Sequence, residues 1–179
     1  MDALRPFDLQ QTTPPLGPTN TVSQVFFSND DNTLFTTVKG DPTKNNTGFL
    51  AAYPVEKNSE CEAGFSGKGV IEDQKATCWA TVSAVSGTAF VTDVAIDRLV
   101  EMSLTDASIL GEIDLSANGD PGLIDLKAAG KFLYALSPGN GTTQAAIAVV
   151  NVVDKKQVQH FELKDLGADK NAQGLAILL

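Results

Sequence analysis

The chain has 179 residues, a net charge of −9 and an isoelectric point near 4.4. With 42% hydrophobic and 20% charged residues it fits one folded domain, which excludes a disordered or fibrous chain. The acidic balance, with no Lys/Arg cluster to offset it, argues against a nucleic-acid partner. The longest apolar run, residues 145–153, is far shorter than the ~20 residues of a membrane helix, so no membrane partner is expected.

The first segment, residues 1–20, is rich in Pro, Thr and Gln. It contains one short extended candidate, Leu4–Leu9, and Pro6 inside it fits an outer strand, because proline cannot donate to a neighbouring strand. The rest of this segment reads as a Pro-rich connection.

Residues 21–77 form a first repeat of short strand-like runs separated by polar turns. The runs are Val22–Ser28, Thr33–Gly40 and Phe49–Tyr53. The fourth strand is obscured by an insert between Cys61 and Cys78, whose glycines 64, 67 and 69 indicate a loop.

Two further repeats and a terminal strand follow. Residues 78–118 predict strands at Trp79–Ala84, Thr88–Asp93, Leu99–Leu104 and Ile109–Leu115. Residues 119–166 predict strands at Gly122–Leu126, Lys131–Ser137, Ala145–Val153 and Val158–Leu163. In residues 167–179, Gln173–Leu179 matches the first strand of another repeat.

The spacing of these repeats predicts an all-β fold. The second strands begin at Thr33, Thr88 and Lys131, intervals of 55 and 43 residues. Repeats of ~40–50 residues with about four strands are typical of β-propeller blades. Three blades alone would leave long sheet edges exposed, which folded proteins avoid. The chain therefore reads as about three and a half blades of a larger ring, and its expected partner is the missing N-terminal half of the same propeller.

Polar residues at the strand ends are the candidate ligand-binding groups. Lys39, Asp93 and Ser137 end the second strands near one mouth of the ring, where they could bind a small ligand, and Trp79 at an inner-strand start could form a pocket wall. The alternative is that these residues cap strands, meet water or pack in the channel. His160, the only histidine, falls on an outermost strand and is expected to face solvent or bond locally, and Arg98 is expected to form a surface ion pair. No residue is assigned a catalytic role, and no metal or cofactor motif occurs.

The cysteines and two sequons indicate an extracellular protein. Cys61 and Cys78 form a single pair without metal-ligand spacing, which leaves a disulfide or two thiols, and the disulfide is the prediction. The sequons at Asn45 and Asn140 lie in turn-rich loops that could carry glycans. Secretion or cell-surface exposure is the expected location.

Several strings, taken in order, resemble secreted fungal 3-carboxy-cis,cis-muconate cyclase-like proteins, which belong to the lactonase propeller superfamily. The strings are Leu4–Leu9, Thr13–Val22, Leu34–Pro42, Gly48–Val55 and Cys78–Val82. The resemblance is collinear over nearly the whole chain and implies the C-terminal half of a seven-bladed propeller. It also implies cycloisomerase or lactonase activity on a small carboxylated substrate, with His, Arg and carboxylate groups around the channel.

This chain departs from that pattern at its inner strands. They begin with Asn20–Val22, Cys78–Trp79 and Pro121–Gly122, and none carries His or Arg. The alternative function is therefore a non-enzymatic extracellular glycoprotein, such as a surface antigen, adhesin or binding scaffold.

Overall fold

A computed structural model describes residues 9, 12, 14–15, 17, 21–40, 47–56, 62–63 and 65–178. Within these residues the chain forms three antiparallel sheets, two short 3-10 turns and no α-helix. The 3-10 turns are η2 (Ser116–Asn118) and η3 (Lys164–Leu166). In the same residues no helix is long and apolar enough to cross a membrane.

Each sheet takes its main strands in chain order, so every sheet is a meander. The first sheet contains β1 (Val22–Phe27), β2 (Thr33–Val38), β3 (Phe49–Glu56) and β5 (Gly67–Val70), with the short β4 (Glu62–Ala63) pairing with the end of β3. The second contains β6 (Thr77–Ser83), β7 (Thr88–Asp93), β8 (Arg98–Met102) and β9 (Ile109–Asp114). The third contains β10 (Asp125–Ala129), β11 (Phe132–Ser137), β12 (Ala146–Asn151) and β13 (Lys156–Glu162).

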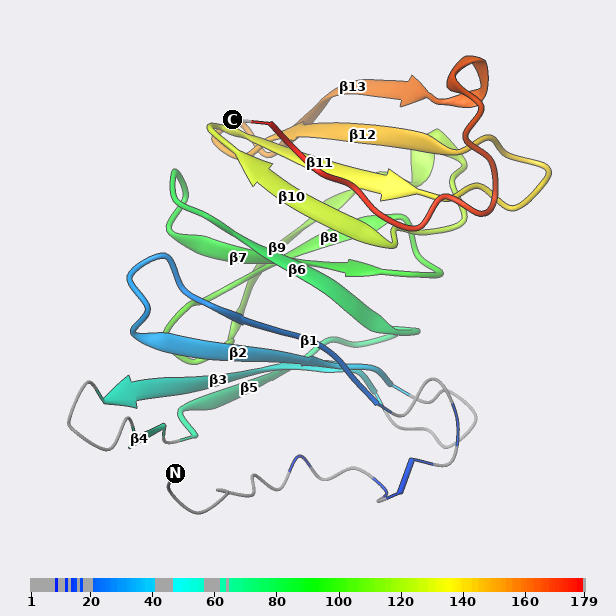
Figure 1. The fold of residues 1–179 in the computed structure, drawn as a ribbon. Helices are drawn as coiled ribbons and strands as arrows, with labels where there is room; N and C mark the ends of the chain where they lie inside the picture. Colours follow the sequence, from blue (N-terminus) through cyan, green and yellow to red (C-terminus); the bar gives the residue numbers. More distant parts are fainter. Residues whose placement is uncertain are drawn as a thin grey trace.

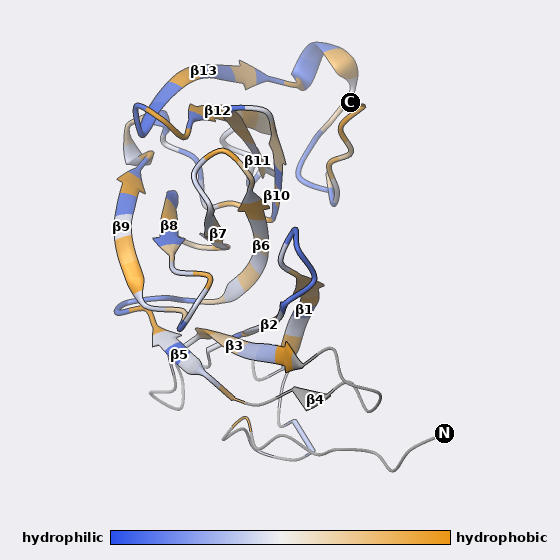
Figure 2. Ribbon diagram, turned by 90° about the vertical axis from the view of Figure 1, so that its left-hand side faces the viewer, coloured by the Kyte–Doolittle hydropathy of each residue, from blue (hydrophilic) through white to orange (hydrophobic). Residues whose placement is uncertain are grey.

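The three sheets pack face to face and are arranged radially, with their first strands on the same side (Figure 1). The first strands β1, β6 and β10 lie together along one side, and β6 contacts both of the others. Figure 2 shows the first strands on one side of the stack and the last strands β5 and β9 on the opposite side. The three sheets are therefore blades, with β1, β6 and β10 as their inner strands.

The middle blade is buried on both faces. Alternate side chains of a strand point to opposite faces of its sheet. On β7, Val91 joins a core with Phe35 and Leu50 of the first blade. Its neighbour Phe90 joins a second core with Leu126 and Leu133 of the third blade. Five of the six residues of β7 are therefore buried, including the polar Thr92 and Asp93.

Most strands lie where the sequence predicts them, but three predictions differ from the structure. The outer strand of the first blade is Gly67–Val70, in a stretch whose glycines indicated a loop. The first strand of the third blade begins at Asp125 instead of Gly122, because Leu123 is buried in the connection and donates its N–H to the Asp93 carbonyl (2.7 Å). Residues 173–178 form no strand, since none of the described strands pairs with them. The strand predicted at Leu4–Leu9 lies outside the described residues apart from Leu9.

Candidate functional site

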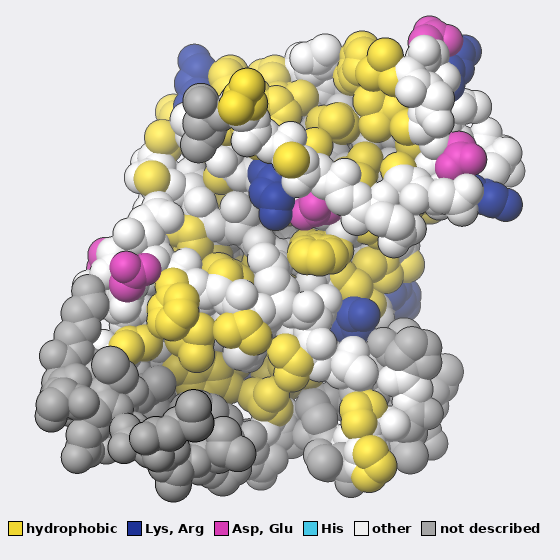
Figure 3. All heavy atoms as spheres, viewed as in Figure 1, with side chains coloured by type: hydrophobic (Ala, Val, Ile, Leu, Met, Phe, Trp, Pro, Cys, Tyr) yellow, Lys and Arg dark blue, Asp and Glu magenta, His cyan; other side chains and the backbone are white. Residues whose placement is uncertain are grey.

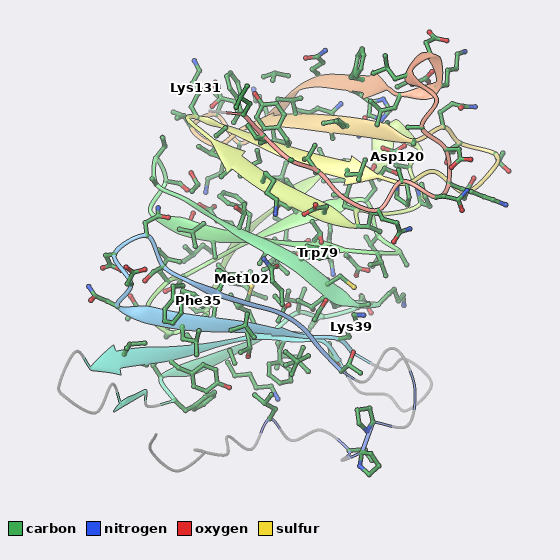
Figure 4. All side chains as sticks on the ribbon, viewed as in Figure 1. Phe35, Lys39, Trp79, Met102, Asp120 and Lys131 are labelled. Carbon is green, nitrogen blue, oxygen red and sulfur yellow. The ribbon has the colours of Figure 1, made fainter. Side chains whose placement is uncertain are left out.

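Strand pairing brings the candidate residues to one mouth of the inner channel. Val22 pairs with Val38, Thr77 with Asp93 and Asp125 with Leu136, so each inner strand begins beside the end of its second strand. Lys39, Asp93 and Ser137 therefore lie on one face of the molecule, together with the connections between blades. Figure 4 labels Lys39 at the end of β2 and Trp79 on β6.

Asp93 is fully buried and holds the connection that enters the second blade. Its carboxylate accepts backbone N–H groups from Lys75 (2.8 Å), Ala76 (3.4 Å) and Ala95 (3.0 Å). Burial raises the pKa of Asp93, while these three N–H donors and the charge of Arg98 oppose the rise. In this arrangement the carboxylate caps backbone groups.

Arg98 orders the same connection from its other side. Its guanidinium donates to the Glu72 carbonyl (2.8 Å) and to Gln74 Oε1 (3.3 Å), and it pairs with Glu112 (3.2 Å). Gln74 in turn donates to the Thr92 carbonyl (3.0 Å) next to Asp93. Arg98 thus makes the expected ion pair and also fixes residues 72–74, a role that its sequence context did not indicate.

Lys39 and Cys78 meet at the mouth between the first and second blades. Burial raises the pKa of the Cys78 thiol, the Lys39 ammonium and the Ser23 hydroxyl lower it, and Asp93 adds to the rise. Cys78 is therefore within electrostatic reach of both Lys39 and Asp93, which come from separate strands. Lys39 is partly exposed and its backbone N–H bonds the Thr21 carbonyl (3.0 Å).

The other two candidates are placed differently. Ser137 is fully buried, and its hydroxyl accepts the N–H of Gly139 at 3.5 Å. Trp79 is half-buried on β6, and its carbonyl accepts the Thr92 hydroxyl (3.3 Å). Of the four candidates, Lys39 and Asp93 both act electrostatically on Cys78, and no described contact joins any two of the four directly.

Two residues of the third blade complete the mouth. Asp125 Oδ2 accepts the N–H of Leu175 (2.7 Å), which fixes the C-terminal segment against β10. Lys127 of the same inner strand lies 3.5 Å from Asp125 Oδ1 and keeps 41% of its side chain exposed. Sequence reasoning missed Lys127, which directly follows the predicted inner strand Gly122–Leu126 and lies within the observed strand β10.

The two described cavities lie elsewhere. One, of about 540 Å³, lies between the first and second blades at the hairpin end, among Ser28, Asp30, Ser83 and Thr105. The other, of about 280 Å³, lies between Thr143 and Lys170. Neither is lined by Lys39, Trp79, Asp93 or Ser137. Within the described chain no group of three His, Cys, Asp or Glu side chains is placed to hold a metal.

The remaining predictions concern cysteines and sequons. Cys78 is buried and forms no disulfide with any described residue. Cys61 lies outside the described residues, so the Cys61–Cys78 disulfide stays a prediction. Asn45 also lies outside them. Asn140 is exposed, and its Oδ1 accepts the N–H groups of Thr142 (2.8 Å) and Thr143 (2.9 Å) in a tight turn.

Comparison with solved structures identifies the architecture. The chain resembles a putative 6-phosphogluconolactonase from Bacteroides uniformis, with a TM-score of 0.61, 18% identity and coverage of 79% of this chain and 41% of that one. The fold is a partial β-propeller. The chain also resembles the periplasmic gluconolactonase of Pseudomonas aeruginosa, with a TM-score of 0.55, 16% identity and coverage of 76% and 42%. Hydrazine synthase of Kuenenia stuttgartiensis follows, with a TM-score of 0.52, 13% identity and coverage of 82% and 50%.

At these identities the likeness establishes the propeller fold alone. No protein-family model matches the sequence, and no curated protein sequence matches it. The propeller chain spans half or less of the length of the solved structures that it resembles.

Proposed function

We propose that this chain is one part of a lactonase-type propeller that holds a small carboxylated lactone, or its ring-opened acid, at the mouth of the channel. The observation that carries the proposal is that Lys39 and Asp93 follow or end second strands at one mouth of the channel, in a fold shared with a putative 6-phosphogluconolactonase and a periplasmic gluconolactonase. A cation at the mouth suits a carboxylated ligand, because it neutralises the charge that the ligand brings.

The finer proposal follows the sequence resemblance to carboxymuconate cyclase-like proteins. Cycloisomerisation of a carboxymuconate, or opening of the corresponding lactone, needs cations for the carboxylates and an acid/base for proton transfer. Lys39 and Lys127 are the cations that this chain contributes from the mouth and from inner strand β10. The acid/base would come from the rest of the ring.

The partner in this proposal is the remaining part of the propeller, the N-terminal half. Inner strand β1 exposes Val22 (44%), Val25 (57%) and Phe27 (52%). Figure 3 views the side of the molecule that carries the inner strands and shows many hydrophobic and few charged side chains there. Further blades would close the ring and enclose this side in a channel, and the coverage of about two fifths of the two lactonase structures leaves length for them. Secretion and glycosylation at Asn140 belong to the same proposal.

The test is turnover by the protein with and without the rest of its ring. Loss of carboxymuconate absorbance, or acid release from gluconolactone, should require the complete propeller. Lys39→Met should reduce kcat/KM about tenfold or more, since it removes a charged contact to the ligand. Lys156→Met, on the exposed outer strand β13, is the matched control and should have no effect. Absence of turnover by the complete protein at micromolar enzyme would reject the enzymatic proposal.

One observation favours the second candidate, a non-enzymatic extracellular glycoprotein that binds a ligand or a surface. The only histidine of the chain, His160 on outer strand β13, pairs with Asp120. The Asp93 carboxylate accepts hydrogen bonds from backbone N–H groups. Neither group is placed as a general base for a ligand at the mouth. Binding of carboxymuconate by calorimetry without turnover would support this second candidate.

A further inference from the structure

The boundary between the second and third blades contains an acidic cluster away from the mouth. Asp120, in the connection from β9 to β10, accepts a hydrogen bond or proton from His160 Nε2 of β13 at 2.9 Å. The Asp120 side chain is only 3% exposed and that of His160 is 23% exposed. Beside this pair, Asn118 and Gln157 exchange two amide hydrogen bonds of 2.8 and 2.9 Å. Two side-chain pairs thus dock the connection onto the outer strand of the third blade.

Asp97 lies behind this pair, and neither of its carboxylate oxygens is in good hydrogen-bond geometry with a donor; the nearest donor that acts on it is the Asn118 amide. The residue is 6% exposed, and both carboxylate oxygens are inaccessible and without a partner. An ionised carboxylate in such a place is costly, because it has lost its water and neither oxygen has gained a well-formed hydrogen bond in return. The carboxyl group therefore favours its neutral, protonated form.

The neighbouring carboxylates also favour the protonated form of Asp97. Burial raises the pKa of Asp97 to about 7, and the negative charges of Asp120 and Asp114 add to the rise. His160 and the Asn118 side chain oppose it. Arg98, although next in sequence, turns its guanidinium to Glu72, Gln74 and Glu112. Among the described groups that act on Asp97, His160 is thus the only cation.

We infer that Asp97, Asp120 and His160 form a proton-dependent lock between the second and third blades. The lock is closed while Asp97 is a neutral acid and the contact between His160 Nε2 and Asp120 Oδ2 holds the connection against β13. It loosens when Asp97 loses its proton to solvent, because a second buried negative charge then faces Asp120. Each step is a simple proton exchange with water and needs no other reactant.

The lock is connected to the mouth by a short piece of chain. Three residues after Asp120, Leu123 donates its N–H to the Asp93 carbonyl at 2.7 Å. Gly122 between them lies against the backbone of Val94, where a Cβ would come within 2.3 Å. Release of Asp120 would therefore loosen the segment that holds the Asp93 corner of the mouth. The inference does not depend on the proposed function, because it concerns the blade boundary itself.

The expected pH dependence follows from the direction of the shift. Asp97 binds its proton more tightly in the folded protein than in the unfolded chain, whose carboxyl has a pKa near 3.8. Its stabilising effect is therefore complete below about pH 4, declines as the pH rises toward 7 and is lost above 7.

The experiment combines carboxyl-carbon NMR titration of the 179-residue chain with urea midpoints at pH 5 and pH 8. Asp97 should titrate near pH 7, and the wild-type midpoint should be lower at pH 8. Asp97→Asn should remove most of that difference, whereas Asp165→Asn, an exposed control, should keep it. His160→Gln should move the Asp97 titration to higher pH and Asp120→Asn to lower pH.

The two opposite shifts distinguish a coupled lock from an isolated buried acid. Titration of Asp97 near its ordinary value would overturn the inference, and so would an Asp97→Asn variant with the wild-type pH difference. If Asp97→Asn fails to fold, the titrations of the wild type and of His160→Gln decide the matter. An Asp97 titration that is unchanged in both His160→Gln and Asp120→Asn would also overturn it.

Discussion

Single glycines determine how closely the first two blades approach each other. Gly67 and Gly69 lie on the same face of β5, toward the turn between β8 and β9. A Cβ at Gly69 would lie 1.8 Å from the Ala107 carbonyl oxygen and 2.2 Å from Met102 Cε. Both distances are far inside van der Waals contact, and the carbonyl belongs to the backbone, so the blades would have to separate.

Gly69→Ala should therefore destabilise the chain by about 3 kcal/mol, at the upper end of ordinary overpacking. Gly111→Ala is the matched control on the outer strand β9, where the nearest atom to a new Cβ is 4.0 Å away. It should be neutral or stabilising by about 0.5 kcal/mol, because alanine loses less backbone entropy than glycine. Urea unfolding of both variants measures the difference, and equal stability of the two would contradict this account.

Between elements, an ion pair with a buried carboxylate and a half-exposed lysine joins the hairpin ends of the second and third blades. Lys155, in the turn between β12 and β13, pairs with Glu101 of β8. The Glu101 side chain is 5% exposed and its other oxygen accepts the Thr88 hydroxyl at 2.9 Å. Loss of the lysine would leave a buried carboxylate without its cation, which costs more than loss of a surface pair.

Lys155→Met should destabilise the chain by about 1–2 kcal/mol, a range reduced because the lysine is half exposed. Adding Glu101→Gln should restore part of that loss, so that a double-mutant cycle gives a coupling of about 1 kcal/mol. Lys156→Met, one residue along and exposed, should change stability little. Strictly additive effects in the cycle would show that the pair does not stabilise the boundary.

The success of sequence-based prediction differed between elements for physical reasons. The runs at β7 and β11 were readable because each carries consecutive β-forming or apolar residues bounded by turn residues. Strand β5 was missed because its glycines serve contact with another blade, which no local pattern reveals. The strand predicted at 173–179 failed because a strand also needs a partner. At the site, the placement of Lys39 and Asp93 followed from strand ends, but the pairing of His160 with Asp120 joins residues 40 apart and has no local indication.

Over the whole molecule, the two blade boundaries are built from different interactions. The first and second blades are joined by neutral or backbone hydrogen bonds, such as Gln24 Oε1 to the Ala80 N–H (2.7 Å) and the Ser66 hydroxyl to the Thr105 carbonyl (3.0 Å). The second and third blades are joined by Lys155–Glu101 at one end and His160–Asp120 at the other. Salt and pH should therefore act mainly on the second boundary.

Each of the two blade boundaries also has its own apolar core, so the two boundaries can be tested separately. Phe90 is fully buried between the second and third blades, and Phe35 is fully buried between the first and second. Either Phe→Ala change should cost about 3–5 kcal/mol, since each leaves a large cavity. If each blade is stabilised mainly by its neighbour, the loss should be local. Phe90→Ala should then speed amide exchange in β10, β11 and β12 more than in β2 and β3, and Phe35→Ala should do the reverse.

Hydrogen exchange followed by mass spectrometry at peptide resolution distinguishes this local response from global unfolding. Exchange that increases equally in all three sheets in both variants would show that the blades unfold as one cooperative unit. The same measurement on the wild type at pH 5 and pH 8 also tests the pH dependence of the second boundary. Exchange in β10–β13 should then increase at pH 8 beyond the ordinary base-catalysed rise, because Asp97 at the second boundary has lost its proton. Exchange at the boundary between the first and second blades should rise only by the ordinary base-catalysed amount.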